Sequence, residues 1–354
     1  MAISSKENWL HTVRRTNPEW MPYSIALTTP LWLNLREELE KVVVRHPKTW
    51  PNYKPGPSNW GELRIAPHQT PGRDFVDQWG SVWRTNVAGM TGTVIKPVLE
   101  DLSKLDSFTP PDPETYNGGW GPMDWNKVAE QMARAKANGN LARTGLGHGY
   151  FLLRLEYLRG FQNLMCDLIE EPPEFRRLVG IVHGLNKNAV RRAIEAGAEV
   201  IGLPEDLGSQ TASIIGPRMF RKWVTPYHKE LHDLARNAGC FTHFHCDGAI
   251  MDVADQILEI HPDVFNPQDV ANGIDNLAAA FKDRLCIDLD FDRQNALPFG
   301  TPKEIRELVE YEVRALGSRT GGLMLRAGVW GDVPPENVDA LAGACEEFSV
   351  YWFR

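Results

Sequence analysis

The sequence predicts an α/β fold of the (β/α)8 TIM-barrel class behind an irregular N-terminal cap rich in tryptophan and proline. From about residue 142, short apolar runs alternate with amphipathic helical stretches, as buried parallel strands and their covering helices do. Five such strand–helix units fit between residues 198 and 348, and 354 residues suffice for a whole barrel. An open doubly wound sheet is the alternative, but no Gly-x-Gly-x-x-Gly follows a predicted strand.

The first 70 residues are expected to form the cap, and residues 71–354 the barrel. Within the cap the sequence predicts helices at 5–15 and 31–44, because closely spaced prolines interrupt any longer element. Nine of the twelve tryptophans lie at or before Trp125. Most are expected to pack the cap, but tryptophan also suits the wall of an apolar pocket, so Trp79 and Trp83 are candidate substrate-binding residues.

The remaining elements follow in order along the chain, with the earlier barrel units expected within 70–170. Strands are predicted at 198–203, 241–246, 263–267, 285–290 and 322–326. Helices are predicted at 125–138, 173–197, 217–238, 250–260, 276–282, 302–316 and 335–348.

Composition and charge exclude several classes of protein. A net charge of -8 argues against a nucleic-acid-binding surface. Neither an 18-residue apolar run nor an apolar signal core is present, so the sequence predicts a cytoplasmic protein without a membrane span. The five cysteines are scattered without a Cys-x-x-Cys pair, which argues against a disulfide framework. The expected partners are a small-molecule substrate and a second copy of the chain in a homodimer.

The stretch 241–248 reads as a strand that runs into a glycine turn. Because side chains alternate along a strand, His243, His245 and Asp247 share one face. Two imidazoles and a carboxylate could hold a metal, transfer protons or bind a charged ligand. The alternative is a pair of hydrogen-bonded histidines at a strand end.

Polar side chains also end the other predicted strands. In parallel barrels the reacting groups lie at the C-terminal ends of the strands, and these ends are polar whereas the opposite ends are apolar. For each acidic residue the alternative role is a helix N-cap. The candidates added here are Glu205, Asp206, Asn266, Gln268, Asp292 and Arg326, joined as substrate-binding candidates by His148, Tyr150 and Gln210.

Several stretches resemble segments of the uroporphyrinogen decarboxylase superfamily, especially the branch allied to corrinoid-dependent methyltransferases. They are LRGFQNL (158–164), PEDLGSQ (204–210), HCDG (245–248), DRQNALPFGTP (292–302) and PPEN (334–337). Their order and spacing extend the resemblance over roughly residues 70–350. The resemblance implies a TIM barrel, in agreement with the strand–helix pattern.

Two departures from the family pattern limit what it implies. The arginine-rich N-terminal motif of the true decarboxylase has no counterpart at residues 14–18, so decarboxylation of uroporphyrinogen is not expected. The zinc methyltransferases use His-x-Cys and a later cysteine, where this chain has His245-x-Asp247 and Val329 or a neighbour. A divalent metal such as zinc would therefore bind oxygen and nitrogen ligands, namely His243, His245, Asp247 and Glu205, or the site holds no metal.

The resemblance implies a methyltransferase or demethylase that moves a methyl group from a small methylated compound to a corrinoid (cobalamin) on a partner protein. A methoxylated aromatic is one such donor. The expected catalytic residues are His245, Asp247, Asp206, Glu205 and Asp292.

Two alternatives remain open. One is a cofactor-independent decarboxylase or lyase, in which Arg326 or Arg293 binds a carboxylate and Asp292 or Asp206 protonates the carbanion. The other is a non-catalytic barrel that binds a small ligand.

Overall fold

The computed structural model describes residues 3–57, 60–61 and 63–354. By its internal contacts the chain divides into two units. The first comprises Met1–Gly72, Thr85–Gly92 and Pro267–Arg354, and the second comprises Arg73–Arg84 and Thr93–Asn266.

The first unit contains a parallel sheet in the order β1 (Tyr23–Leu27), β10 (Leu323–Val329) and β9 (Cys286–Asp290). Every residue of β9 is buried, as expected for a parallel strand that is covered on both faces. The unit's helices are α1 (Ser5–Arg14), α2 (Thr29–Leu35), α3 (Glu37–Arg45), α11 (Ile274–Phe281), α12 (Ala296–Phe299), α13 (Pro302–Leu316) and α14 (Pro335–Phe348), with the 3-10 helix η2 (Pro67–Gln69).

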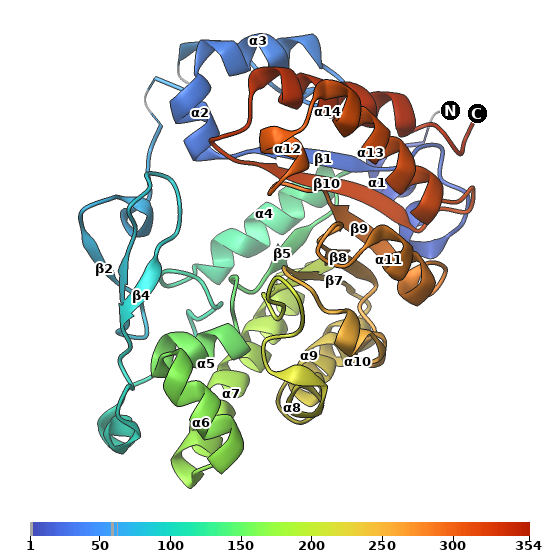
Figure 1. The fold of residues 1–354 in the computed structure, drawn as a ribbon. Helices are drawn as coiled ribbons and strands as arrows, with labels where there is room; N and C mark the ends of the chain where they lie inside the picture. The colour runs from blue at the N-terminus through green and yellow to red at the C-terminus, as the bar shows by residue number, and fades with distance from the viewer. Residues whose placement is uncertain (1–2, 58–59, 62) are drawn as a thin grey trace. The chain divides into compact units, whose positions relative to one another are not determined.

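Helix α13 shows how the sequence sets a helix start in this unit. Pro302 occupies its first turn, and Thr301 and Glu304 form a reciprocal capping box. Its buried stripe, which includes Val309 and Val313, packs toward α14, and the two helices lie side by side in the ribbon (Figure 1).

The second unit contains the parallel strands β5 (Arg143–Gly145), β6 (Val200–Pro204) and β7 (Phe241–Cys246), followed in order by β8 (Val264–Pro267). An antiparallel sheet of β2 (Asp74–Val76), β3 (Val82–Arg84) and β4 (Thr93–Lys96) belongs to the same unit. Its helices are α4 (Trp125–Ala137), α5 (Leu152–Arg159), α6 (Phe161–Glu170), α7 (Pro173–Glu195), α8 (Gly216–Trp223), α9 (Thr225–Asn237) and α10 (Ala254–Ile260), with the 3-10 helices η3 (Leu102–Ser107) and η4 (Met251–Val253).

All five strands predicted beyond residue 198 are present, whereas several other elements differ from the prediction. Tyr23–Leu27 forms β1 and pairs with β10, although no strand was expected in the first 70 residues. The helix expected at 31–44 is divided at Arg36, whose φ of 44° lies outside the helical region. The helix expected at 217–238 is divided before Pro226, because proline cannot donate to the carbonyl four residues earlier.

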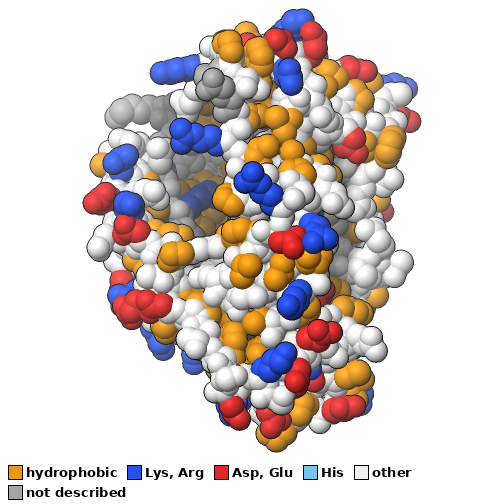
Figure 2. Space-filling model, turned by 90° about the vertical axis from the view of Figure 1, so that its left-hand side faces the viewer, with side chains coloured by type: hydrophobic (Ala, Val, Ile, Leu, Met, Phe, Trp, Pro, Cys, Tyr) orange, Lys and Arg blue, Asp and Glu red, His pale blue; other side chains and the backbone are white. Residues whose placement is uncertain are grey.

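Acidic and basic side chains are interspersed on the face shown in Figure 2, with hydrophobic side chains between them. That face therefore carries no field of a single sign. Among the described residues, no helix combines the length and apolar character needed to cross a bilayer.

Candidate active site

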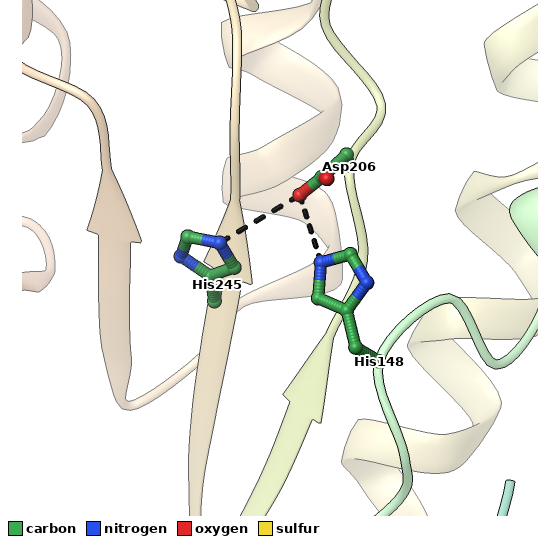
Figure 3. A group of neighbouring side chains, drawn as sticks. All are labelled: His148, Asp206 and His245. Atoms are coloured by element: carbon green, nitrogen blue, oxygen red, sulfur yellow. Dashed lines mark hydrogen bonds and ion pairs between the residues drawn. The ribbon is translucent and has the colours of Figure 1, made fainter. Parts of the chain in front are cut away.

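Three side chains of the second unit, His148, Asp206 and His245, converge at the C-terminal ends of neighbouring strands (Figure 3). His148 follows β5, Asp206 follows β6, and His245 lies near the end of β7, where it is in register with Pro204. Nε2 of His148 is 3.0 Å from Oδ1 of Asp206, and Nε2 of His245 is 3.6 Å from the same oxygen. Two of the candidates at predicted strand ends, Asp206 and His245, therefore lie close together.

The loops after β6 and β7 are held together by their backbones. The amide of Asp247 donates to Oδ1 of Asp206 at 3.2 Å, and the amide of Gly208 donates to the carbonyl of Asp247 at 3.1 Å. A Cβ on Gly248, whose φ is +83°, would stand 2.3 Å from the carbonyl carbon of Gly208. Only glycine permits this close approach of the two backbones. The Gly208–Gly248 contact therefore fixes the backbone positions of Asp206 and Asp247.

Strand β7 alternates as predicted: Thr242, Phe244 and Cys246 are buried, while His243 and His245 are partly exposed. Nδ1 of His245 lies 2.8 Å from Oδ1 of Asn266, which can only accept a hydrogen bond. The hydrogen of a neutral His245 ring therefore sits on Nδ1, and Nε2 keeps its lone pair. That lone pair faces the carboxylates of Asp206 and Asp247, the latter at 3.3 Å.

The charges of the three residues differ. Burial lowers the pKa of His148, but its hydrogen bond to Asp206 and the surrounding carboxylates outweigh burial and raise that pKa. Burial raises the pKa of Asp206, and the hydrogen bond from His148 together with both histidine charges lowers it overall. Burial lowers the pKa of His245 more than the nearby carboxylates raise it. His148 and Asp206 therefore favour each other's charged forms, whereas burial favours the neutral form of His245.

This donor set could hold a divalent cation. The ligand atoms of His148, Asp206 and His245 lie within 4.8 Å of one another, and two imidazoles with a carboxylate suit zinc. A cation would also relieve the repulsion between the Nε2 lone pair and the facing carboxylates. Cys246 does not supply a thiolate, because burial holds its thiol pKa well above the ordinary value and its sulfur contacts the Leu207 amide.

The structure separates His243 from this set. Among the described residues, His243 is not one of those close enough to share an ion with His148, Asp206 and His245, although it lies on the same face of β7 as His245. Asp247 lies beside His245, as its spacing on the strand predicts.

Glu205 precedes Asp206 in the chain and is fully buried. Its Oε1 accepts the amides of Phe151 and Leu153 at 3.0 and 2.9 Å, so it caps α5. Its Oε2 is 2.9 Å from Nε2 of His228, whose Nδ1 is 2.8 Å from the hydroxyl of Tyr150. Glu205 and Tyr150 thus support the loops at the strand ends.

The sequence did not single out His228. It lies on the buried face of α9, where a histidine has no local signal to separate it from an ordinary core position. The i, i+4 pair of His228 and His232 on one helical face was the available hint.

Trp79 and Trp83 are both buried in the second unit. The indole of Trp83 donates to Oδ2 of Asp77 at 2.9 Å, and Arg154 pairs with the same oxygen at 3.0 Å. Trp79 packs edge to face against Tyr116. These contacts place the two tryptophans in the packing around a buried ion pair, and their binding of substrate stays a prediction.

The other candidates lie outside this cluster. Gln210 is exposed in the loop after β6. In the first unit, Gln268 is buried and Arg326 is exposed. The carboxylate of Asp292 accepts the backbone amides of Gln294, Asn295 and Ala296 at 2.9 to 3.0 Å, so it organises the loop before α12. Its catalytic role stays a prediction.

The family model described as uroporphyrinogen decarboxylase (URO-D) matches residues 86–348. The chain is similar to the solved structure of a methyltransferase from Methanosarcina mazei, with 13% identity, coverage of 97% of this chain and 98% of that chain, and a TM-score of 0.66. It is also similar to a B12-independent methionine synthase from Shewanella, with 10% identity, coverage of 66% and 68%, and a TM-score of 0.40. No curated protein sequence matches it. The likeness to the methyltransferase from Methanosarcina mazei confirms the predicted fold class.

Proposed function

The chain belongs to the uroporphyrinogen decarboxylase family, and from that premise we propose that it is a methyltransferase. It takes a methyl group from a small methylated compound, such as a methoxylated aromatic, and passes it to a corrinoid on a partner protein. One observation carries the proposal: His148, Asp206 and His245 offer nitrogen and oxygen ligands from three successive strand ends.

The residues of the site fit a divalent cation such as zinc, held by His148, Asp206 and His245. When bound, the cation acts as a Lewis acid toward the oxygen that carries the methyl group. Asn266 fixes the ring orientation and tautomer of His245, as ligand-supporting groups do in metal sites.

Methyl transfer needs no oxidant. The bond between the methyl carbon and the donor oxygen breaks, the electron pair stays on that oxygen, and the carbon bonds to the electron-rich acceptor. The backbone contact of Gly208 with Gly248 holds Asp206 and His245 in place before the donor arrives.

Metal analysis joined to an activity assay tests the proposal. The purified chain is expected to bind one zinc ion and to transfer methyl groups from a panel of methoxybenzoates to reduced cobalamin, followed by absorbance. Asp206→Ala and His245→Ala should lose both metal and transfer. The matched control is His243→Ala, which removes an imidazole from the same strand face and should keep the metal.

Two results would overturn the proposal. Absence of bound metal together with absence of transfer from every methoxylated donor would remove its basis. Release of carbon dioxide from a carboxylated substrate by metal-free protein would favour the decarboxylase alternative instead.

A further inference from the structure

The first unit contains a cavity of about 840 Å³, and its lining residues are not those used in the proposed function. Its walls come from the segments that follow β1, β9 and β10, together with residues 85–92. Because these three strands are parallel neighbours, their C-terminal ends lie at one edge of the sheet. Ligand sites in parallel sheets occur at such edges.

The walls of the cavity are held in place by the fold. Asn34 donates to the carbonyl of Gly331 at 2.5 Å, which ties α2 to the segment after β10. Gly89 approaches Thr29 so closely that a Cβ would meet that side chain at 2.7 Å. These contacts fix the positions of the segments that line the cavity relative to one another.

The lining is mainly apolar, with one cation on its wall. Leu33, Val87, Met90 and Trp330 provide aliphatic, thioether and aromatic surface, which suits a flat apolar body. Arg293 lines the same cavity with a side chain that is 17% exposed, and Asp290 anchors it at 3.3 Å. A partly buried guanidinium is the side chain best suited to a carboxylate.

Two of the lining side chains, Arg293 and Trp330, bring N–H-bearing atoms close together beside Gly328. A Cβ built on Gly328 would lie 3.7 Å from Nη1 of Arg293 and 3.7 Å from Nε1 of Trp330. The indole nitrogen can only donate, as can the guanidinium. An acceptor oxygen placed over Gly328 would therefore meet a neutral and a charged donor together.

We propose that this cavity binds an aromatic monocarboxylate, with its ring against Trp330 and the apolar wall and its carboxylate at Arg293. Asp332 is exposed and also lines the cavity, and its repulsion grows with ligand charge, so it disfavours a multiply charged phosphate more than a monocarboxylate. The inference rests on the first unit alone and does not require methyl transfer or a metal.

Calorimetric titration of the full chain, with chelator present, tests this inference. The probes are 4-methoxybenzoate, its neutral analogue 4-methoxybenzamide, and acetate. The benzoate should bind about tenfold or more tightly than the amide, as a charge-assisted hydrogen bond predicts. Acetate should bind far more weakly than the benzoate, because it lacks the apolar body.

Variants assign the binding to this cavity. Arg293→Gln should remove the preference for the acid over the amide. Gly328→Ala places a methyl group at ordinary contact distance from both donors, so the fold should be kept while benzoate binding weakens. Arg314→Gln, which neutralises an exposed arginine on α13, is the matched control and should bind like the wild type.

Three outcomes would overturn the inference: equal affinity for the benzoate and the amide, unchanged benzoate affinity in both Arg293→Gln and Gly328→Ala, or equal affinity for acetate and the benzoate. Failure of the methyl-transfer assay would leave this result standing, because the titration contains neither acceptor nor metal.

Discussion

Replacement of the buried Glu205 should destabilise the protein strongly. Its carboxylate accepts two backbone amides at the start of α5 and faces His228 at 2.9 Å, with no exposure to water. Hydrogen bonds to a charged acceptor contribute roughly 1.5 kcal/mol each at the low end of their range, so two give roughly 3 kcal/mol. Loss of side-chain packing adds about 1 kcal/mol. Glu205→Ala should therefore lower the free energy of unfolding by about 4 kcal/mol.

The isosteric variant separates hydrogen bonding from packing. Glu205→Gln keeps an oxygen that can accept the amides of Phe151 and Leu153, so the expected loss is only about 1–2 kcal/mol. The matched control is Glu230→Gln, the same change at a half-exposed position on α9, which should cost less than about 1 kcal/mol.

Urea unfolding followed by circular dichroism provides these free energies. The reasoning would be refuted if Glu205→Ala cost less than about 1 kcal/mol, the size of an ordinary surface change. It would also be refuted if the alanine and glutamine variants were equally destabilised, because the retained acceptor would then contribute nothing.

Two further predictions concern the second unit. Burial holds the pKa of His232 well below its ordinary value of 6.5. Below about pH 6.5 the unfolded chain therefore binds a proton at this residue that the folded chain does not bind. The free energy of unfolding should fall as the pH drops through this range, by up to about 1.4 kcal/mol per pH unit. In His232→Leu the urea midpoint should depend less on pH than in the wild type. The control Leu231→Ala should lower the midpoint equally at pH 5 and pH 7. If His232→Leu kept the pH dependence of the wild type, His232 would not be its source. Gly248→Ala should destabilise by about 2 kcal/mol or more, because its Cβ would overlap Gly208, while Gly239→Ala has the same positive φ with open space and should cost less. Equal losses in the two glycine variants, measured by urea unfolding, would show that backbone conformation rather than the contact sets the cost.

The alternation of strands and helices beyond residue 198 could be predicted because each strand is a short apolar run between amphipathic helices. The same pattern located the strand ends, and Asp206 and His245 lie together because the strands are parallel neighbours. Strand β1 was missed because Tyr23–Leu27 carries a partly exposed, mixed pattern among prolines and finds its partner some 300 residues later, at Leu325.

The roles of individual acids were less predictable. Glu205 and Asp206 are adjacent, yet one caps a buried helix start and the other joins the two histidines. Alternation along the chain separates their directions, but it does not say which direction faces the core. Likewise His243 and His245 share a face of β7, but only His245, which is nearer the C-terminal end of the strand, lies close to His148 and Asp206.

The contact between Gly208 and Gly248 has a consequence for how the site can change. Since the two loops are joined main chain to main chain, neither can shift without carrying the other. A displacement of one loop would therefore move both Asp206 and His245. A change in the length of one loop would shift both residues, so a new ligand specificity at this edge is expected from side-chain substitutions.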